Sequence, residues 1–351
     1  MIQKHWWKAL GVVILIYSFT AGMLVPLKPG IVEVAPQSAA TGTTVEFKVT
    51  GYNSHYKEAE DSLRAWLKMD NEHALGADKI NVLDDQHLRV TFSIPEYLPN
   101  KDRVKDFSLL LDNTVDGASV LPSAVFVTQD SIDPAMGQAA WVNSPIANLS
   151  SKDAMNFPFR NILAEGIRNT YYHVPLWFAM ILIFLGSVVY SIRYLRTYDP
   201  MYDHRAQALN TAGLLFGILG LVTGSIWAKF TWGAYWNWDV KQNMTAIALL
   251  IYLAYFILRN SFEDDEQKAR ISSVYNLFAF AALIPLIYVI PRLTDSLHPG
   301  AGGNPAMGGE DLDNTMRMVF YPAIIGWTLI GLWIANLFYR TKQLEHRLLD
   351  L

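Results

Sequence analysis

Between two strongly apolar segments lies the stretch Trp227-Ala-Lys-Phe-Thr-Trp232-Gly-Ala-Tyr-Trp236-Asn-Trp238-Asp239, which holds four tryptophans and ends in a carboxylate. Aromatic residues gather at membrane interfaces, but an anchoring belt needs far fewer rings at each helix end. The density of rings, interrupted by a glycine, predicts a platform for a large, flat, apolar ligand. Asp239 is expected to orient a neighbouring backbone group or a cation.

The composition indicates an integral membrane protein. Of the 351 residues, 52% are hydrophobic and 17% are charged, whereas soluble domains are about a quarter charged. The net charge of -4 gives no reason to expect nucleic acid as a partner. Because the sequence has no cysteine, disulfide scaffolds, thiolate metal sites and cysteine nucleophiles are excluded. A metal would therefore need histidine, carboxylate or methionine ligands.

Six apolar segments are close to the length of about 20 residues that crosses a bilayer. They predict a polytopic α-helical protein with transmembrane helices over residues 9–25, 175–194, 209–230, 244–258, 273–290 and 318–339. The first segment follows Lys4 and Lys8 and has no clean small-residue cleavage site. Residues 1–27 are therefore expected to form a retained transmembrane anchor helix.

Basic residues predict the orientation of these spans. They cluster between the second and third spans, between the fourth and fifth, and in the tail: Arg193, Arg196, Arg205, Arg259, Lys268, Arg270, Arg340, Lys342 and Arg347. Since short basic loops stay in the cytoplasm, both termini are expected there. Residues 27–174, the aromatic stretch and residues 291–317 then face outward.

Alternating polar and apolar residues predict an extracytoplasmic all-β domain over residues 28–130. Strands are expected near 44–50, 87–95, 107–112 and 123–127, with turn residues between them. About seven short strands over about a hundred residues favour an immunoglobulin-like sandwich. Residues 131–172 are expected to form an irregular connector. A docking or spacing role is expected for this domain.

Two histidines lie at the predicted outer membrane edge, His173 before the second span and His298 after the fifth. Two neutral imidazoles beside an aromatic platform suit a porphyrin, whose iron takes axial ligands on opposite faces. The alternative is that each histidine only caps a helix end or lies in the headgroup region of the membrane. No span carries an acidic residue or a histidine near its middle, which argues against an ion-coupled transporter. The third span carries glycines that indicate close helix packing, Gly213, Gly217, Gly220 and Gly224.

The aromatic stretch resembles the tryptophan-rich WWD motif of the heme-handling proteins of cytochrome c maturation. Within that group, the six-span layout resembles the heme exporter protein C family, CcmC. In that family a histidine in a His-Val-Pro context precedes the second span, as His173-Val174-Pro175 does here. A second histidine in a Leu-His-x-Gly context follows the fifth span, as Leu297-His298-Pro299-Gly300 does. The resemblance covers about residues 160–340.

The resemblance implies that His173 and His298 are the axial ligands of a heme b at the outer face of the bacterial inner membrane. It implies a five-helix heme-handling domain over residues 173–340 and a cytoplasmic tail over 341–351. The WWD loop, residues 227–242, would cradle the macrocycle with Trp227, Trp232, Gly233, Tyr235, Trp236, Trp238, Asp239 and Lys241. The implied activity is non-catalytic delivery of heme to a CcmE-like chaperone, with CcmA- and CcmB-like subunits of an ATP-binding cassette transporter.

Two alternatives to heme delivery remain open. A CcsA-like cytochrome c heme lyase component is disfavoured because such relatives carry an additional histidine pair within their spans. A non-heme membrane receptor or transporter subunit is the other alternative. The sequence also departs from the family, with Tyr235 in place of tryptophan, Lys241 in place of arginine, and a large outer domain. The heme propionates need cations, and five lie near the outer interface: Arg168, Lys229, Lys241, Arg292 and Arg317.

Overall fold

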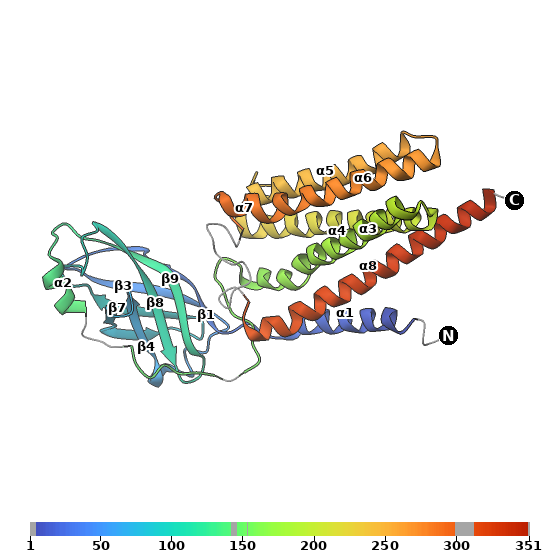
Figure 1. Cartoon of the computed structure of the whole chain (residues 1–351). Coiled ribbons are helices and arrows are strands. Elements are labelled where there is room, and N and C mark those ends of the chain that lie inside the picture. Colours follow the sequence, from blue (N-terminus) through green and yellow to red (C-terminus); the bar gives the residue numbers. More distant parts are fainter. Residues whose placement is uncertain (1–4, 142–145, 153, 299–311, 350–351) are drawn as a thin grey trace. The chain divides into compact units, whose positions relative to one another are not determined.

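A β-rich unit is inserted in the sequence between the first helix and the remaining helices. The computed structural model describes residues 5–141, 146–152, 154–298 and 312–349. Pro26–Glu165 form the β-rich unit, and Met1–Val25 join Gly166–Leu351 in the helical unit (Figure 1). The chain therefore has a separate β-rich region and a helical region, as expected from the sequence.

Nine strands of the described residues form two sheets in the β-rich unit, compared with about seven expected. The first sheet has the order β1 (Gly30–Ala35), β3 (Thr44–Tyr52), β7 (His87–Ser93) and β6 (Lys79–Val82), with all neighbours antiparallel. The second has the order β2 (Ser38–Ala40), β9 (Gly117–Thr128), β8 (Val104–Asn113), β4 (Arg64–Lys68) and β5 (Ala74–Gly76). In the second sheet β2 runs parallel to β9 and the other pairs are antiparallel.

Side chains from both sheets fill one hydrophobic core. Phe47 and Phe92 from the first sheet and Phe107 from the second are fully buried. The segment after β9 contributes helix α2 (Pro134–Trp141). Its Trp141 stacks on Phe107 at a ring-centroid distance of 4.7 Å and donates its Nε1–H to the Tyr97 carbonyl at 3.0 Å. The expected irregular connector thus includes a helix, because one buried tryptophan anchors it to the core.

Six helical segments of the described chain are long and apolar enough to cross a membrane, which confirms the predicted number. They are α1 (Trp6–Leu24), α3 (His173–Thr197) with the 3-10 turns before it (Ala164–Tyr171), α4 (Pro200–Trp232), α5 (Val240–Asn260), α6 (Asp265–Ile284) with its extension, and α8 (Asn314–Leu349). The extension is a π-helical turn (Pro285–Val289) followed by α7 (Ile290–Leu293). The change of helix type begins at Pro285, since proline lacks the N–H that an α-helix interior needs.

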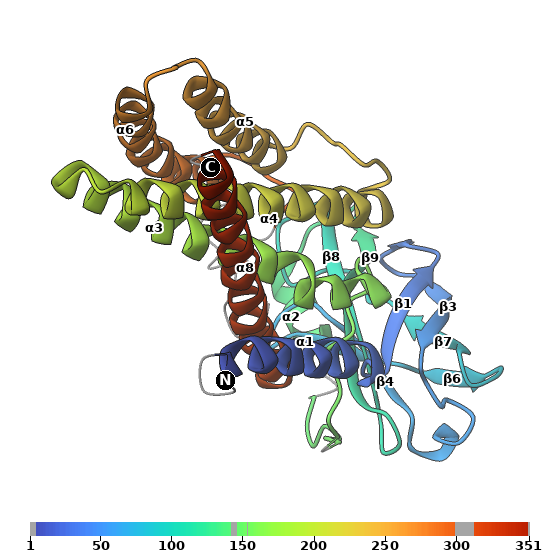
Figure 2. The ribbon, with the colours of Figure 1, turned by 90° about the vertical axis from the view of Figure 1, so that its right-hand side faces the viewer.

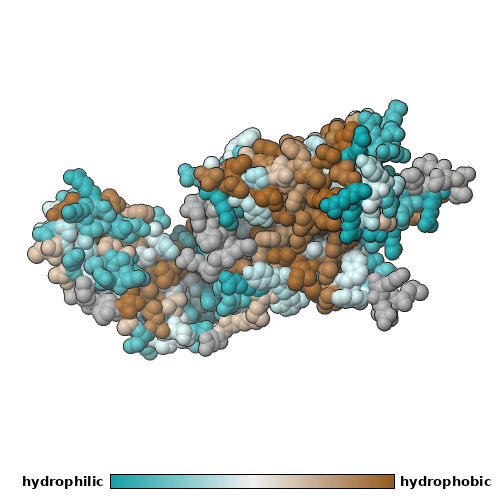
Figure 3. Space-filling model, viewed as in Figure 1, coloured by the Kyte–Doolittle hydropathy of each residue, from teal (hydrophilic) through white to brown (hydrophobic). Residues whose placement is uncertain are grey.

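Within the helical unit, α5 and α6 lie side by side and α1 runs along α8 (Figures 1 and 2). The glycines of α4 allow its neighbours to approach closely. A Cβ added at Gly213 would fall 2.5 Å from the Phe184 ring, and one at Gly217 would fall 2.4 Å from Leu249. Hydrophobic residues cover much of the helical unit's surface in Figure 3. Exposed apolar side chains of the helices include Leu250, Ile257 and Phe278. Such a surface is expected where helices face lipid.

Candidate functional site

The aromatic stretch is helical at both ends, so its loop is shorter than residues 227–242. Helix α4 continues through Trp232, and Gly233 ends it with a φ of +84° and its N–H on the Lys229 carbonyl at 3.1 Å. Glycine favours this left-handed conformation because it has no Cβ. Helix α5 begins at Val240. Trp227 and Trp232 therefore project from a helix, which fixes their rings.

Asp239 is a buried carboxylate that joins two segments distant in sequence. It caps α5 by accepting the Lys241 N–H at 2.9 Å. It also accepts the Leu297 N–H at 2.7 Å, the Ser296 hydroxyl at 2.9 Å and His298 Nδ1–H at 2.8 Å. Burial alone would raise the pKa of Asp239, but the Leu297 N–H, the nearby His298 and the other donors together hold it below its ordinary value. Asp239 thus holds two backbone N–H groups and the His298 ring.

His298 presents a free ring nitrogen to the site. Because a carboxylate only accepts hydrogen bonds, the bond to Asp239 places the proton on Nδ1. Within the described part of the chain, Nε2 has no hydrogen-bond partner. The ring lies edge-on to Trp232 with centroids 4.7 Å apart. Burial, with the charge of Lys241 adding to it and Asp239 opposing it, lowers the pKa of His298 to about 4. The imidazole is therefore neutral at neutral pH, as a metal ligand must be.

His173 lies at the first position of α3 and packs against the last turns of α4. Its ring is 5.8 Å from that of Trp227, centroid to centroid. Gly224 gives it room, because a Cβ there would fall 2.6 Å from His173 Cε1. Nδ1 lies 3.0 Å from Thr223 Oγ1, and Nε2 accepts the Trp177 Nε1–H at 3.3 Å. The structure thus places each predicted histidine against a predicted tryptophan, and both tryptophans belong to α4.

The comparison with protein families covers the part of the chain that holds these residues. The model of heme exporter protein C, CcmC, matches residues 138–350. The chain belongs to the CcmC family. The matched range contains the histidines and the aromatic stretch, whereas α1 and the nine strands precede it.

The similarity to individual CcmC proteins is moderate. Heme exporter protein C of Bradyrhizobium diazoefficiens is 28% identical over 192 residues, which are 53% of this chain and 70% of that protein. The protein of the same name from Paracoccus denitrificans is 27% identical over 182 residues, 52% of this chain and 75% of that protein. The Escherichia coli K12 protein is 26% identical over 164 residues, 47% of this chain and 65% of that protein.

The other predicted residues of the CcmC motif differ in their exposure and their contacts. Tyr235 and Trp238 are 60% and 78% exposed, and Lys229 Nζ lies over the Tyr235 ring, 5.8 Å from its centroid. Trp236 packs edge-on to Trp238 with centroids 6.5 Å apart. Gly233 acts as a helix stop. The Pro299 and Gly300 of the Leu-His-x-Gly context lie outside the described residues.

Three residues that contact the predicted site residues were not predicted from the sequence: Trp177, Thr223 and Ser296. Trp177 follows His173 by four residues, a spacing that places two side chains on the same face of a helix. This spacing is a local signal from which Trp177 could have been predicted. Thr223 and Ser296 became visible only through contacts between distant segments, 50 residues apart for Thr223 and His173 and 57 for Ser296 and Asp239.

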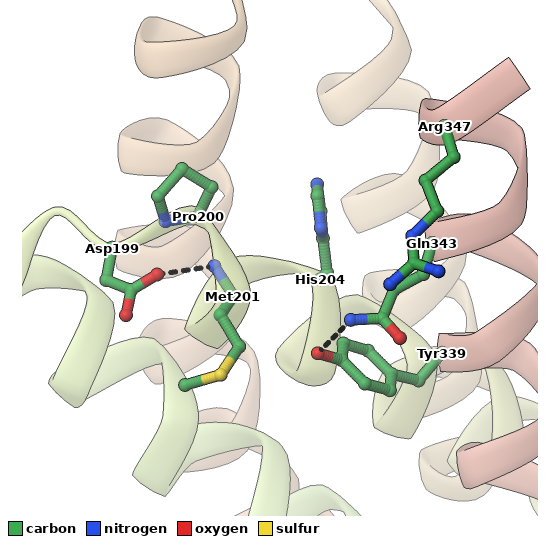
Figure 4. Close-up of a pocket in the computed structure, with 7 residues that line it drawn as sticks. All are labelled: Asp199, Pro200, Met201, His204, Tyr339, Gln343 and Arg347. Carbon is green, nitrogen blue, oxygen red and sulfur yellow. Dashed lines mark hydrogen bonds between the residues drawn. The ribbon is translucent and has the colours of Figure 1, made fainter. Parts of the chain in front are cut away.

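A separate cavity of about 340 Å³ lies at the other end of α4 (Figure 4). The beginning of α4 and the end of α8 line it, with Asp199, Pro200, Met201, His204, Tyr339, Gln343 and Arg347. None of the predicted heme-site residues is among them. This cavity is therefore separate from the residues that the sequence predicted to hold heme.

Proposed function

We propose that this chain binds heme b between His173 and His298 and delivers it to a heme chaperone during cytochrome c maturation. The observation that carries the proposal is that each imidazole lies against a tryptophan of one helix end, His173 against Trp227 and His298 against Trp232. These tryptophans are five residues apart, which corresponds to about 7.5 Å along a helix. Membership in the CcmC family supports heme as the ligand.

The residues present fit a heme group. Within the described part of the chain, neither His298 Nε2 nor the buried Trp227 Nε1–H has a hydrogen-bond partner, so Nε2 can bind a metal and the indole can donate to a bound group. Heme, when bound, supplies an iron that takes two axial ligands and a broad apolar face. Burial of such a face contributes at about 25 cal/mol per Å². Lys241, whose charge acts on both histidines, is the proposed partner of a propionate.

Delivery is supported by the exposure of the loop. Tyr235 and Trp238 are open to the surroundings, so a bound heme would remain accessible to an acceptor. We propose that the acceptor is a CcmE-like chaperone and that CcmA- and CcmB-like subunits assist, as the family resemblance implies. The site would face outward from a bacterial inner membrane with both termini cytoplasmic, because basic residues flank the opposite helix ends.

The test is the absorption spectrum of protein purified from heme-replete membranes. The wild type is expected to show a low-spin, bis-histidine heme. His173→Ala and His298→Ala are each expected to weaken or shift that signal, because each removes one axial ligand. A signal indifferent to both substitutions, or a pigment-free wild type, would contradict the proposal.

Gly224→Ala is expected to weaken heme binding about tenfold. The added Cβ would fall 2.6 Å from His173 Cε1 and displace the ring, and a misplaced ligand lowers the affinity for the metal. Heme titration of purified protein measures the effect. Gly213→Ala is the matched control. It lies on the same helix as Gly224 and creates a clash of similar size, but with Phe184, so that His173 stays in place. Equal losses in both variants would show a packing effect only.

For the β-rich unit we propose an immunoglobulin-like sandwich that serves in docking or spacing. The sheet order β1-β3-β7-β6 corresponds to the A-B-E-D sheet of that fold, and the neighbours β9-β8-β4 correspond to G-F-C. The parallel pairing of β2 with β9 leaves β2 as a short edge strand beside the last strand. The nine strands precede the residues that the family model matches, so the proposed role of this unit lies outside the matched range.

A further inference from the structure

The two proposed heme ligands are held by different hydrogen-bond partners. The Thr223 hydroxyl lies within hydrogen-bond distance of two backbone carbonyls, of Leu219 at 2.9 Å and of Gly220 at 3.1 Å, so its proton is directed to the helix backbone. The Thr223 oxygen then accepts from His173 Nδ1–H at 3.0 Å. This assignment leaves a lone pair on His173 Nε2, which accepts the Trp177 indole N–H at 3.3 Å.

We propose that Trp177 caps the ring nitrogen through which His173 would bind iron, and so makes His173 the exchangeable ligand of the pair. The inference rests on the proposed function, because it assumes that His173 ligates heme. One lone pair cannot accept a hydrogen bond and coordinate a metal at the same time. The indole N–H and the iron therefore compete for Nε2, and the hydrogen bond re-forms when heme leaves.

His298 has no such competitor among the described residues. Its Nδ1–H is bound by the Asp239 carboxylate at 2.8 Å, and its Nε2 has no hydrogen-bond partner among the residues that the structure describes. A carboxylate partner raises the basicity of a ligating imidazole, whereas the Thr223 hydroxyl behind His173 is neutral. The asymmetry assigns His298 as the ligand that stays bound to the heme and His173 as the ligand that dissociates first during transfer.

The position of the Trp177 ring is fixed by packing as well as by this hydrogen bond. The indole lies against Gly220 of α4, where an added Cβ would fall 2.7 Å from Trp177 Cε2. The same glycine-rich face seats His173 on Gly224, one helical turn later. The cap is thus held by α4, the helix that also carries Trp227 and Trp232.

Transfer of heme to excess apomyoglobin tests the proposal. Trp177→Phe keeps an aromatic ring and removes the competing N–H, so heme loss is expected to be about fivefold slower, the equivalent of one net hydrogen bond. Trp327→Phe is the matched control, because Trp327 is also in the bundle and its Nε1 has no partner in the described residues. Heme loss from Trp177→Phe at the wild-type rate, or faster, would overturn the proposal.

Two further variants keep the test specific. Gly220→Ala displaces the indole by contact, so it is expected to slow heme loss even if Trp177→Phe folds poorly. In a His173→Ala background, Trp177→Phe is expected to have no effect on heme loss. If His173→Ala leaves the heme spectrum unchanged, the proposed function fails. If His173→Ala changes the spectrum while Trp177→Phe and Gly220→Ala both match the wild type, only the role of Trp177 fails.

Discussion

Replacing Asp239 with alanine is expected to weaken heme binding about 100-fold, the upper end of the range for residues that orient a metal ligand. The reason is that Asp239 holds the histidine and its segment together. It accepts hydrogen bonds from His298 Nδ1–H at 2.8 Å, the Leu297 N–H at 2.7 Å and the Ser296 hydroxyl at 2.9 Å. Without Asp239, no carboxylate fixes the tautomer and the orientation of the His298 ring, and the segment that carries His298 loses its hydrogen bonds to the start of α5. Heme titration of the purified protein measures the loss.

The control for this substitution is a second capping aspartate. Asp264 caps α6 by accepting the Gln267 N–H at 2.7 Å, and among the described residues it has no hydrogen bond to a histidine. Asp264→Ala therefore removes a helix cap, worth about 1 kcal/mol, without touching the site. Ser296→Ala, which removes a single contact of the cluster, is expected to fall between the two. If Asp239→Ala weakens heme binding no more than Asp264→Ala does, the positioning role is wrong.

The sequence predicted the six spans because hydropathy is a local property, readable in about 20 residues. It also predicted strands such as β7, where buried Leu88, Val90 and Phe92 alternate with more exposed residues. The aromatic stretch and the two histidines were identified for the same reason, since each is a short motif. What the pattern could not supply was that Gly233 ends a helix that carries two of the tryptophans.

The missing parts of the site are contacts between distant residues. Asp239 and His298 are 59 residues apart, and nothing in either neighbourhood predicts that they meet. Arg259 illustrates the same limit at the other end of the bundle. The sequence indicated a cytoplasmic basic residue, yet Arg259 is buried beside Asp203, 56 residues earlier. Ion pairs of this kind depend on the packing of α4 against α5, which periodicity does not determine.

Arg259→Ala is expected to destabilise the folded protein by about 3–5 kcal/mol, because it leaves the Asp203 carboxylate buried without its partner. Arg259 donates from Nη1 and Nη2 to the two Asp203 oxygens at 2.8 and 2.5 Å, and the two side chains are 6% and 5% exposed. For a unit of this size the loss corresponds to a fall in Tm of about 10 °C. Thermal unfolding of the purified protein in detergent measures it.

Two variants separate the buried charge from general loss of packing. Arg270→Ala removes an exposed arginine of α6 and is expected to leave Tm unchanged. The double variant Asp203→Leu/Arg259→Met replaces both charges with apolar groups, and since the cost of burying ions disappears, it is expected to be more stable than Arg259→Ala. If the double variant unfolds at the same temperature as Arg259→Ala, the loss comes from packing and not from the unpaired carboxylate. Because this pair joins α4 to α5 at the end opposite the heme-site loop, heme affinity is expected to survive the double substitution.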